Sequence, residues 1–169
     1  MVRALVKPGA AIVDSLTPEK AHLLHMAVGI SGEIAELEGC LAAPAFDFGN
    51  LVEELGDLEF YLEGLRLGVA EVQRRVPDQL PADARSHLVV HGGAALDAVK
   101  KHVVYNKPLE VDLLQTALDD IEASLAVIRA TYDVSREEVL AGNQAKLAVR
   151  YRKGSYSDQQ AVARADKAA

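Results

Sequence analysis

The sequence predicts an all-α fold, a helical bundle of about four to five helices. The first observation is a seam of apolar residues spaced alternately by four and three, as in a helix packed against others: Leu51, Leu55, Leu58, Leu62, Leu65, Val69, Val72 and Val76. The second is that no segment alternates apolar and polar residues as a half-buried strand does. The third is a composition of 169 residues, 50% hydrophobic and 25% charged, which suits one domain with a core and excludes a disordered chain.

The first half of the chain carries two predicted helices. Residues 1–17 form an N-terminal extension, and the first helix begins at Pro18 after the capping residue Thr17. Its apolar stripe consists of Leu23, Met26, Ala27, Ile30, Ile34, Leu37 and Leu41. Pro44 separates this helix from the second, which follows the seam above as far as Pro77.

Three further helices are expected in the second half. The third runs from about Arg85 to Val104 and ends in the turn-forming residues 105–108. Ser135 and Glu138 form a capping box for a fifth helix that reaches about Tyr151. Between them, the fourth helix repeats the four-and-three spacing at Leu114, Leu118, Ile121, Leu125 and Ile128.

The predicted domain covers residues 18–152, and residues 153–169 remain as a polar C-terminal tail with one helical turn after Ser157. Within the domain, the second and fourth helices resemble each other at an offset of 63 residues, so that Asp57 aligns with Asp120. Helices of a bundle share such leucine spacing by default. An internal duplication and a coincidence of heptads therefore both remain open.

The charged residues are distributed unevenly along the chain. There are 18 Lys and Arg against 25 Asp and Glu, a net charge of −7, which argues against a nucleic acid polymer or an anionic membrane as partner. Residues 141–169 are nevertheless basic. No Lys or Arg lies between Lys20 and Arg66, although this interval holds nine carboxylates that need water, distant cations or a metal ion.

Cysteine content and hydropathy predict the compartment. Cys40 is the single cysteine and has no intramolecular disulfide partner, which fits a reducing environment. The apolar run from Ala10 to Val13 is too short for a signal peptide, and no stretch approaches the roughly 18 apolar residues of a membrane-spanning helix. A cytoplasmic protein without a membrane span is expected.

Two pairs of carboxylates are predicted to converge. Glu33 and Glu36 lie about 75° and 135° from the centre of their apolar stripe, and Glu54 and Asp57 lie about 70° and 130° toward the same rotational side. Because antiparallel helices with facing stripes are related by a local two-fold axis, all four side chains should meet at the edge of the seam. The other carboxylates of the second helix are expected in solvent: Glu53, Glu59 and Glu63.

Four converging carboxylates cost free energy unless protons or cations compensate them. All-oxygen ligands favour Mg²⁺, with Mn²⁺ as the second choice, over Zn²⁺. One alternative is that these residues line a solvated helix face. A di-iron centre is disfavoured, because it needs two Glu-x-x-His elements and only Glu19 and His22 have that form.

At these residues the chain resembles the all-α NTP pyrophosphohydrolase superfamily, the MazG-like group that includes dimeric dUTPases and dCTP pyrophosphatases. The similar words are Gly-Ile-Ser-Gly-Glu33-Ile-Ala-Glu36 and, after a spacer of 17 residues, Glu54-Leu-Gly-Asp57. Residues 100–108 and 143–151 look like segments of a phage and bacterial branch, and the similarity spans about residues 18–165. One departure is position 152, an Arg where related sequences often have Pro.

The resemblance implies hydrolysis of a nucleoside triphosphate between its α and β phosphorus atoms, giving the monophosphate and pyrophosphate. Glu33, Glu36, Glu54 and Asp57 would be the Mg²⁺ ligands and carry the catalysis, with the alternative that one of them, such as Glu36, orients or deprotonates the attacking water. A homodimer or homotetramer is expected, because the continuous seams exceed what one thin bundle needs. The alternative is a catalytically silent helical binding module that retains the fold.

Candidate substrate-binding residues lie mostly in the basic section, close to one helix face: Asn143, Lys146, Arg150 and Tyr151. Lys101 is a weaker phosphate candidate, and Tyr61 packs either on a base or in the core. The alternative for Lys146 and Arg150 is that of surface cations near a helix C-terminus. His25 points near the stripe centre and is expected to be buried, whereas the other four histidines show no spacing that assigns a role.

Overall fold

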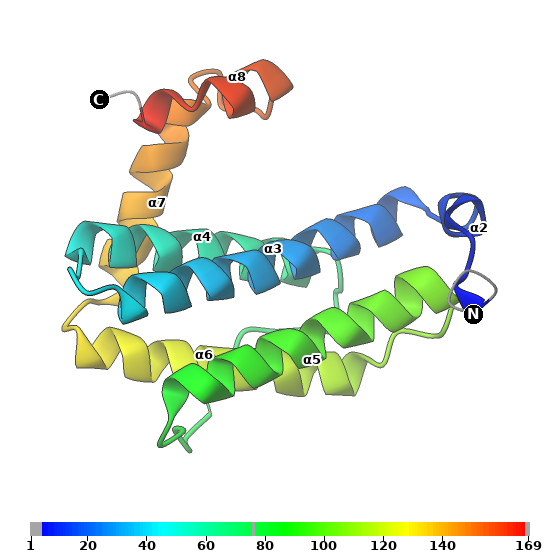
Figure 1. Ribbon diagram of the computed structural model, residues 1–169, viewed down its shortest axis with the longest axis horizontal. Helices are drawn as coiled ribbons and strands as arrows, with labels where there is room; N and C mark the ends of the chain where they lie inside the picture. The colour runs from blue at the N-terminus through cyan, green and yellow to red at the C-terminus, as the bar shows by residue number, and fades with distance from the viewer. Residues whose placement is uncertain (1–4, 76, 168–169) are drawn as a thin grey trace.

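The computed structural model describes residues 5–75 and 77–167, and all regular structure in these ranges is helical (Figure 1). The predicted all-α class is therefore confirmed for the described residues. The elements in chain order are α2 (Gly9–Val13), α3 (Pro18–Ala42), α4 (Phe48–Leu67), α5 (Ala84–Tyr105), α6 (Val111–Thr131), α7 (Arg136–Arg150), α8 (Asp158–Ala163) and the 3₁₀ helix η1 (Ala165–Lys167).

The four long helices α3 to α6 lie side by side, and α7 runs steeply away from them (Figure 1). Helix α3 packs against both α4 and α5, α5 packs against α6, and α7 packs against α4. Their shared core is aliphatic, and its largest fully buried side chains are Ile30, Leu37, Leu51, Leu55, Leu58, Leu62, Leu65, Leu88, Leu114, Leu118, Ile121 and Leu125. Within the described residues, no helix combines the length and hydropathy needed to cross a membrane.

Side-chain caps define the starts of these helices, as the sequence predicted for two of them. Thr17 Oγ1 accepts a hydrogen bond from the third residue of α3, and Ser135 with Glu138 forms the predicted capping box of α7. Asp47 and Asp83 cap α4 and α5 in the same way. Each cap satisfies a backbone N–H that has no partner inside the helix.

The second helix is shorter than predicted. Helix α4 ends before Val69 and Val72, which are still buried but lie on non-helical backbone, and Val76 lies outside the described residues. The Gln115 side chain on α6 accepts a hydrogen bond from the backbone N–H of Gln73 and donates one to its carbonyl oxygen, both at 2.8 Å. This side chain thus replaces the helical partners of Gln73 and holds the chain against α6.

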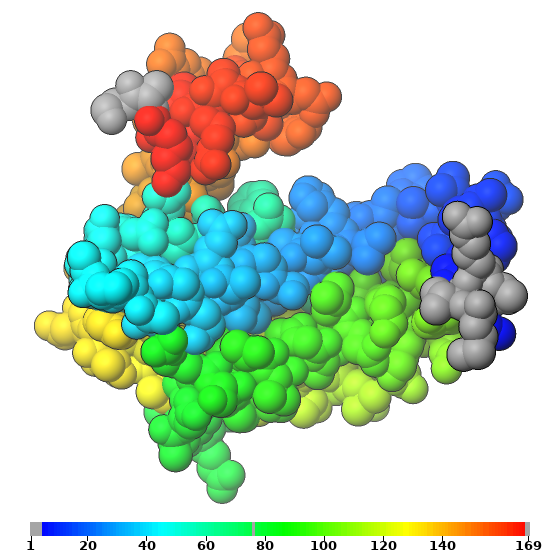
Figure 2. Space-filling view, in the orientation of Figure 1, coloured from blue at the N-terminus to red at the C-terminus, as the bar shows by residue number. Residues whose placement is uncertain are grey.

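Both predicted appendages contact the long helices. In the N-terminal extension, Lys7 Nζ donates a hydrogen bond to the carbonyl oxygen of Val104 at 2.5 Å. The helical turn predicted after Ser157 is confirmed as α8, which begins with Ser157 as its cap. Helix α8 and η1 fold back onto α7, so the C-terminal segment stands over α3 and α4 (Figure 2).

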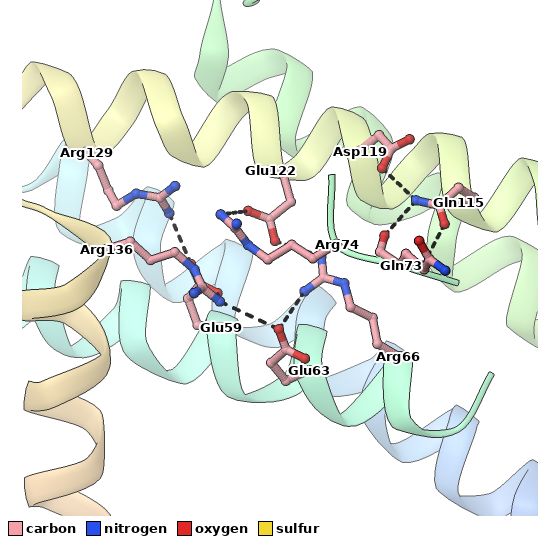
Figure 3. A network of polar contacts seen from close by, with 10 residues as sticks. All are labelled: Glu59, Glu63, Arg66, Gln73, Arg74, Gln115, Asp119, Glu122, Arg129 and Arg136. Carbon is pink, nitrogen blue, oxygen red and sulfur yellow. Dashed lines mark hydrogen bonds and ion pairs between the residues drawn. The ribbon is translucent and has the colours of Figure 1, made fainter. Parts of the chain in front are cut away.

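The prediction that Glu59 lies in solvent is wrong. Its side chain is fully buried between α4 and α6, where the carboxylate accepts hydrogen bonds from Arg129 at 3.1 Å and from Arg136 at 2.9 and 2.8 Å (Figure 3). Helical periodicity predicts the direction of the Glu59 side chain, but it does not predict that arginines from distant segments of the chain will contact it. The expectation for Glu63 is closer, since its side chain is 47% exposed.

A second buried carboxylate completes a reciprocal network (Figure 3). Glu122 on α6 is fully buried and accepts hydrogen bonds from Arg66 at 2.7 Å and Arg74 at 3.1 Å. At the offset of 63 residues, Glu59 corresponds to Glu122 and Arg66 to Arg129, so each helix supplies an arginine to the other's glutamate. A local two-fold axis between α4 and α6 produces such reciprocity, which favours the duplication interpretation of the sequence repeat.

Removing one carboxylate from this network should destabilise the fold strongly. Glu122→Gln leaves two arginines without their buried counter-charge, and we expect a loss of about 3–5 kcal/mol in the free energy of unfolding. The matched control is Glu63→Gln, a half-exposed member of the same network, which should change stability by less than about 1 kcal/mol. Urea denaturation followed by circular dichroism measures both, and equal losses would contradict the interpretation.

Candidate functional site

Three of the four predicted metal ligands meet where α3 packs against α4. One carboxylate oxygen from each of Glu33, Glu36 and Glu54 lies within 4.8 Å of the other two. Glu54 is buried, Glu33 is half-buried and Glu36 is exposed, so the cluster is open on one side. The predicted convergence is thus confirmed for these three side chains.

The fourth predicted ligand, Asp57, joins the cluster to α7. Its Oδ1 accepts a hydrogen bond from Asn143 Nδ2 at 2.7 Å and forms an ion pair with the Lys146 ammonium group. Lys146 also lies 3.4 Å from Glu53 Oε1. Two residues expected to bind substrate therefore hold an acidic residue in place.

Glycines allow the close approach of these side chains. A Cβ atom at Gly56 would lie 2.8 Å from the Cβ of Asn143, so only glycine lets α7 come this close to α4. A Cβ atom at Gly29 would lie 2.2 Å from the ring of Tyr61, which packs across α3 at this point. Both glycines belong to the sequence words that flank the acidic residues.

The cluster holds more negative charge than its neighbours compensate. Burial, followed by the charges of Asp57, Glu36 and Glu54, raises the pKa of Glu33 to about 7. Burial also raises the pKa of Glu54, with further contributions from the neighbouring carboxylates, whereas Lys146 lowers both values. A set of oxygen ligands with excess negative charge suits a hard divalent cation such as Mg²⁺.

The acidic cluster forms part of the wall of a large cavity, about 880 Å³ in volume, beneath the overhanging C-terminal segment (Figure 2). This volume lies in the range of small-molecule pockets, roughly 300–1,000 Å³. Aromatic rings from α3, α4 and the segment that follows α7 also line the cavity: His25, Phe60, Tyr61, Tyr151 and Tyr156. The cavity thus combines carboxylates with flat rings on which a planar group can stack.

Basic residues at the end of α7 and in the C-terminal segment line the same cavity. Arg150 donates two hydrogen bonds to the Asp166 carboxylate, at 2.7 and 2.6 Å, and this pairing lowers the pKa of Asp166 to about 2. Lys167 Nζ donates to Glu53 Oε2 at 2.7 Å, so Glu53 also departs from the predicted solvated state. These pairs fix the segment over the acidic cluster.

The remaining predicted residues divide between the cavity and elsewhere. Tyr61 is half-buried, and Tyr151 caps the end of α7, both in the cavity wall. Lys101 lies on α5 and is not among the lining residues, and its ammonium group pairs with Asp97 at 2.7 Å on the same helix.

The expectation of a buried His25 is wrong. The ring is exposed and meets Tyr61 edge-on, with ring centroids 5.9 Å apart, because the cavity opens on that flank of α3. His22 lies with Nε2 2.7 Å from the carbonyl oxygen of Gly64. In the described ranges, neither His22 nor Glu19 belongs to a group of side chains able to hold a metal ion, which argues against the di-iron alternative.

Sequence reasoning missed several lining residues: Asn50, Phe60, Tyr156, Arg164 and Lys167. Phe60 carried a signal, since it is a large aromatic residue outside the apolar seam of α4 and is 47% exposed. Tyr156, Arg164 and Lys167 line the cavity because the chain reverses direction after α7, and no periodicity in the sequence predicts this reversal.

Comparisons with protein-family models, with curated proteins and with solved structures gave no match to this chain. The family resemblance therefore stays a prediction from the two acidic sequence motifs and their spacing.

The raised pKa of Glu33 predicts how stability depends on pH without divalent cations. A carboxyl group with a folded-state pKa of about 7 and an ordinary value of 4.5 stabilises the fold at low pH and loses this contribution as the pH rises through about 7. Glu33→Gln should therefore be more stable than the wild type at about pH 8, with a smaller difference near pH 4.

Urea denaturation in the presence of EDTA across this pH range measures the difference. Glu38→Gln on the same helix is the control, because Glu38 pairs with Arg85 on the surface. A difference between Glu33→Gln and the wild type that does not change with pH would contradict the uncompensated charge.

Proposed function

We propose that this protein is a Mg²⁺-dependent nucleoside triphosphate pyrophosphohydrolase that converts a (d)NTP into the (d)NMP and pyrophosphate. Its role would be nucleotide-pool control or the removal of unwanted nucleotides. The observation that carries the proposal is the meeting of Glu33, Glu36 and Glu54 within 4.8 Å in the wall of a cavity of about 880 Å³. The aromatic and basic residues of that cavity supply what a base and a triphosphate need.

The metal would be held by Glu33, Glu36 and Glu54, with Asp57 beside them, and Mn²⁺ is the expected substitute for Mg²⁺. Carboxylate oxygens are the ligands of both ions, and the raised pKa of Glu33 supports a cation requirement. When bound, such an ion neutralises charge on phosphate oxygens and lowers the pKa of a coordinated water.

The aromatic and basic residues of the cavity would position the substrate, and two residues of α7 outside its lining would position Asp57. Tyr61 and Tyr151 offer ring faces on which a nucleobase can stack. Arg150 also lines the cavity, and its guanidinium group, which pairs with Asp166, is suited to phosphate oxygens. Lys146 and Asn143 orient Asp57 through direct hydrogen bonds. Lys101 has no part in this proposal, because its charge is engaged with Asp97 outside the cavity.

The finer architecture is part of the same proposal: α3 to α6 form a four-helix bundle that assembles into a homodimer or homotetramer. Exposed apolar side chains support the assembly, among them Val89 and Val90 on α5, which are 50% and 63% exposed, and Leu113 on α6. Sedimentation equilibrium should give a mass at least twice 18.1 kDa. A monomer at micromolar concentration would refute the oligomer.

Activity should depend on the acidic residues. Glu54→Gln and Asp57→Asn are expected to lower kcat/KM by about 100-fold or more, since each removes charge that serves the metal and hence the transition state. Glu38→Gln, a carboxylate on α3 outside the cavity lining, is the control and should retain activity. Circular dichroism checks that the variants remain helical.

The assay is hydrolysis of a panel of ribo- and deoxyribonucleoside triphosphates with Mg²⁺, scored for pyrophosphate against phosphate as product. Pyrophosphate release lost in both acidic variants would support the proposal. No turnover of any nucleotide at micromolar enzyme would favour the catalytically silent binding module, and full activity in both variants would show that the site lies elsewhere.

A further inference from the structure

A second group of metal-ligating side chains lies on the helix pair α5 and α6. His87 and His91 are spaced by four residues on one face of α5, and Asp120 on α6 faces them. One ligand atom from each lies within 4.8 Å of the other two. His91 Nδ1 is 3.1 Å from Asp120 Oδ2, and His87 Nε2 is 3.9 Å from Asp120 Oδ1.

A buried serine sets the tautomer of His87. Ser124 Oγ donates its one hydrogen to the carbonyl oxygen of Asp120 at 2.9 Å, so at 3.0 Å from His87 Nδ1 it acts as acceptor. In the neutral ring, a proton on Nδ1 leaves the lone pair of Nε2, the ring atom nearer Asp120, for a metal ion. A hydrogen bond to the far ring nitrogen is the arrangement that orients metal-bound histidines in proteins.

The ligand types differ from those of the acidic cluster. Two imidazole nitrogens and one carboxylate oxygen suit Zn²⁺ and its first-row neighbours, such as Co²⁺ and Ni²⁺, better than Mg²⁺. The side chains of His87, His91 and Asp120 are 30%, 24% and 28% exposed, so an ion can enter while the helices hold its ligands.

The position of this group in the fold matches that of the acidic cluster. Asp120 corresponds to Asp57 at the offset of 63 residues that relates α6 to α4. Helices α3 and α5 are related in the same way, at an offset of 58 residues, which aligns Glu33 with His91. Five pairs of buried residues share this offset: Met26 and Ala84, Ile30 and Leu88, Ile34 and Gly92, Leu37 and Ala95, and Cys40 and Ala98. The same local geometry thus brings ligand atoms together twice.

We propose that His87, His91 and Asp120 bind a Zn²⁺-type transition-metal ion, whose remaining coordination positions are open to water. Three protein ligands, with water in the fourth position, are the usual coordination of a catalytic zinc ion in proteins. This site is independent of the proposed hydrolase, because it uses different helices and different ligand chemistry.

Isothermal titration calorimetry of the full chain with Zn²⁺ tests the proposal, in excess Mg²⁺ that competes for the acidic cluster. We expect one Zn²⁺ per chain in the wild type and loss of that binding in His91→Gln and Asp120→Asn. The control is His102→Gln on the same helix, because His102 Nδ1 lies 2.7 Å from the carbonyl oxygen of Lys107 instead. Glu33→Gln separates the two sites and should keep the Zn²⁺ binding.

The role of Ser124 gives a graded readout. Ser124→Ala removes the hydrogen bond that orients His87, and we expect it to weaken Zn²⁺ binding by about 10–100-fold. In thermal unfolding, Zn²⁺ should raise the melting temperature of the wild type and of His102→Gln, but not that of His91→Gln.

The decisive outcomes are distinct. A wild type that binds no Zn²⁺, or a Zn²⁺ isotherm that is unchanged in both His91→Gln and Asp120→Asn, would overturn the proposal. If either variant fails to fold, as seen by circular dichroism, the wild type alone still decides, since NMR of its ring protons should show Zn²⁺-dependent shifts at His87 and His91 and none at His102.

Discussion

The reciprocal pairing of buried charges between α4 and α6 is the constraint on which the rest of the structure depends. Removing Glu59 and Glu122 from water is costly unless each carboxylate meets cations in good geometry, and each meets two arginines. Sliding α4 by one turn would leave these charges buried and unpaired. Whereas aliphatic side chains tolerate small shifts, this network admits one register.

That register also determines the candidate site, because α4 carries both. Glu59 contacts Arg136, the first residue of α7, so the charge network holds the start of α7 against α4. From there α7 crosses α4 at Gly56, which brings Asn143 to Asp57. The contact of Asp57 with α7 thus depends on ion pairs that lie outside the acidic cluster.

The positions of the long helices, two of their caps and the convergence of three carboxylates could be predicted from sequence, since each follows from local periodicity or local residue type. The burial of Glu59, the early end of α4 and the exposure of His25 could not. In each case the outcome depends on a partner distant in sequence or on a flank left open: arginines from α6 and α7, the Gln115 side chain, and the cavity beside α3. The periodicity of a single helix predicts the direction of a side chain but not which residues of other segments it will contact.

The two ligand clusters show how one packing arrangement can serve different chemistries. Where Tyr61 lies over Gly29 in the acidic cluster, the corresponding Ser124 bonds His87 in the other. The aromatic ring lies beside carboxylates in one cluster, whereas the hydroxyl group hydrogen-bonds an imidazole in the other. Hard oxygen ligands and nitrogen ligands prefer different ions, so our two proposals assign Mg²⁺ and a Zn²⁺-type ion to equivalent positions of the fold.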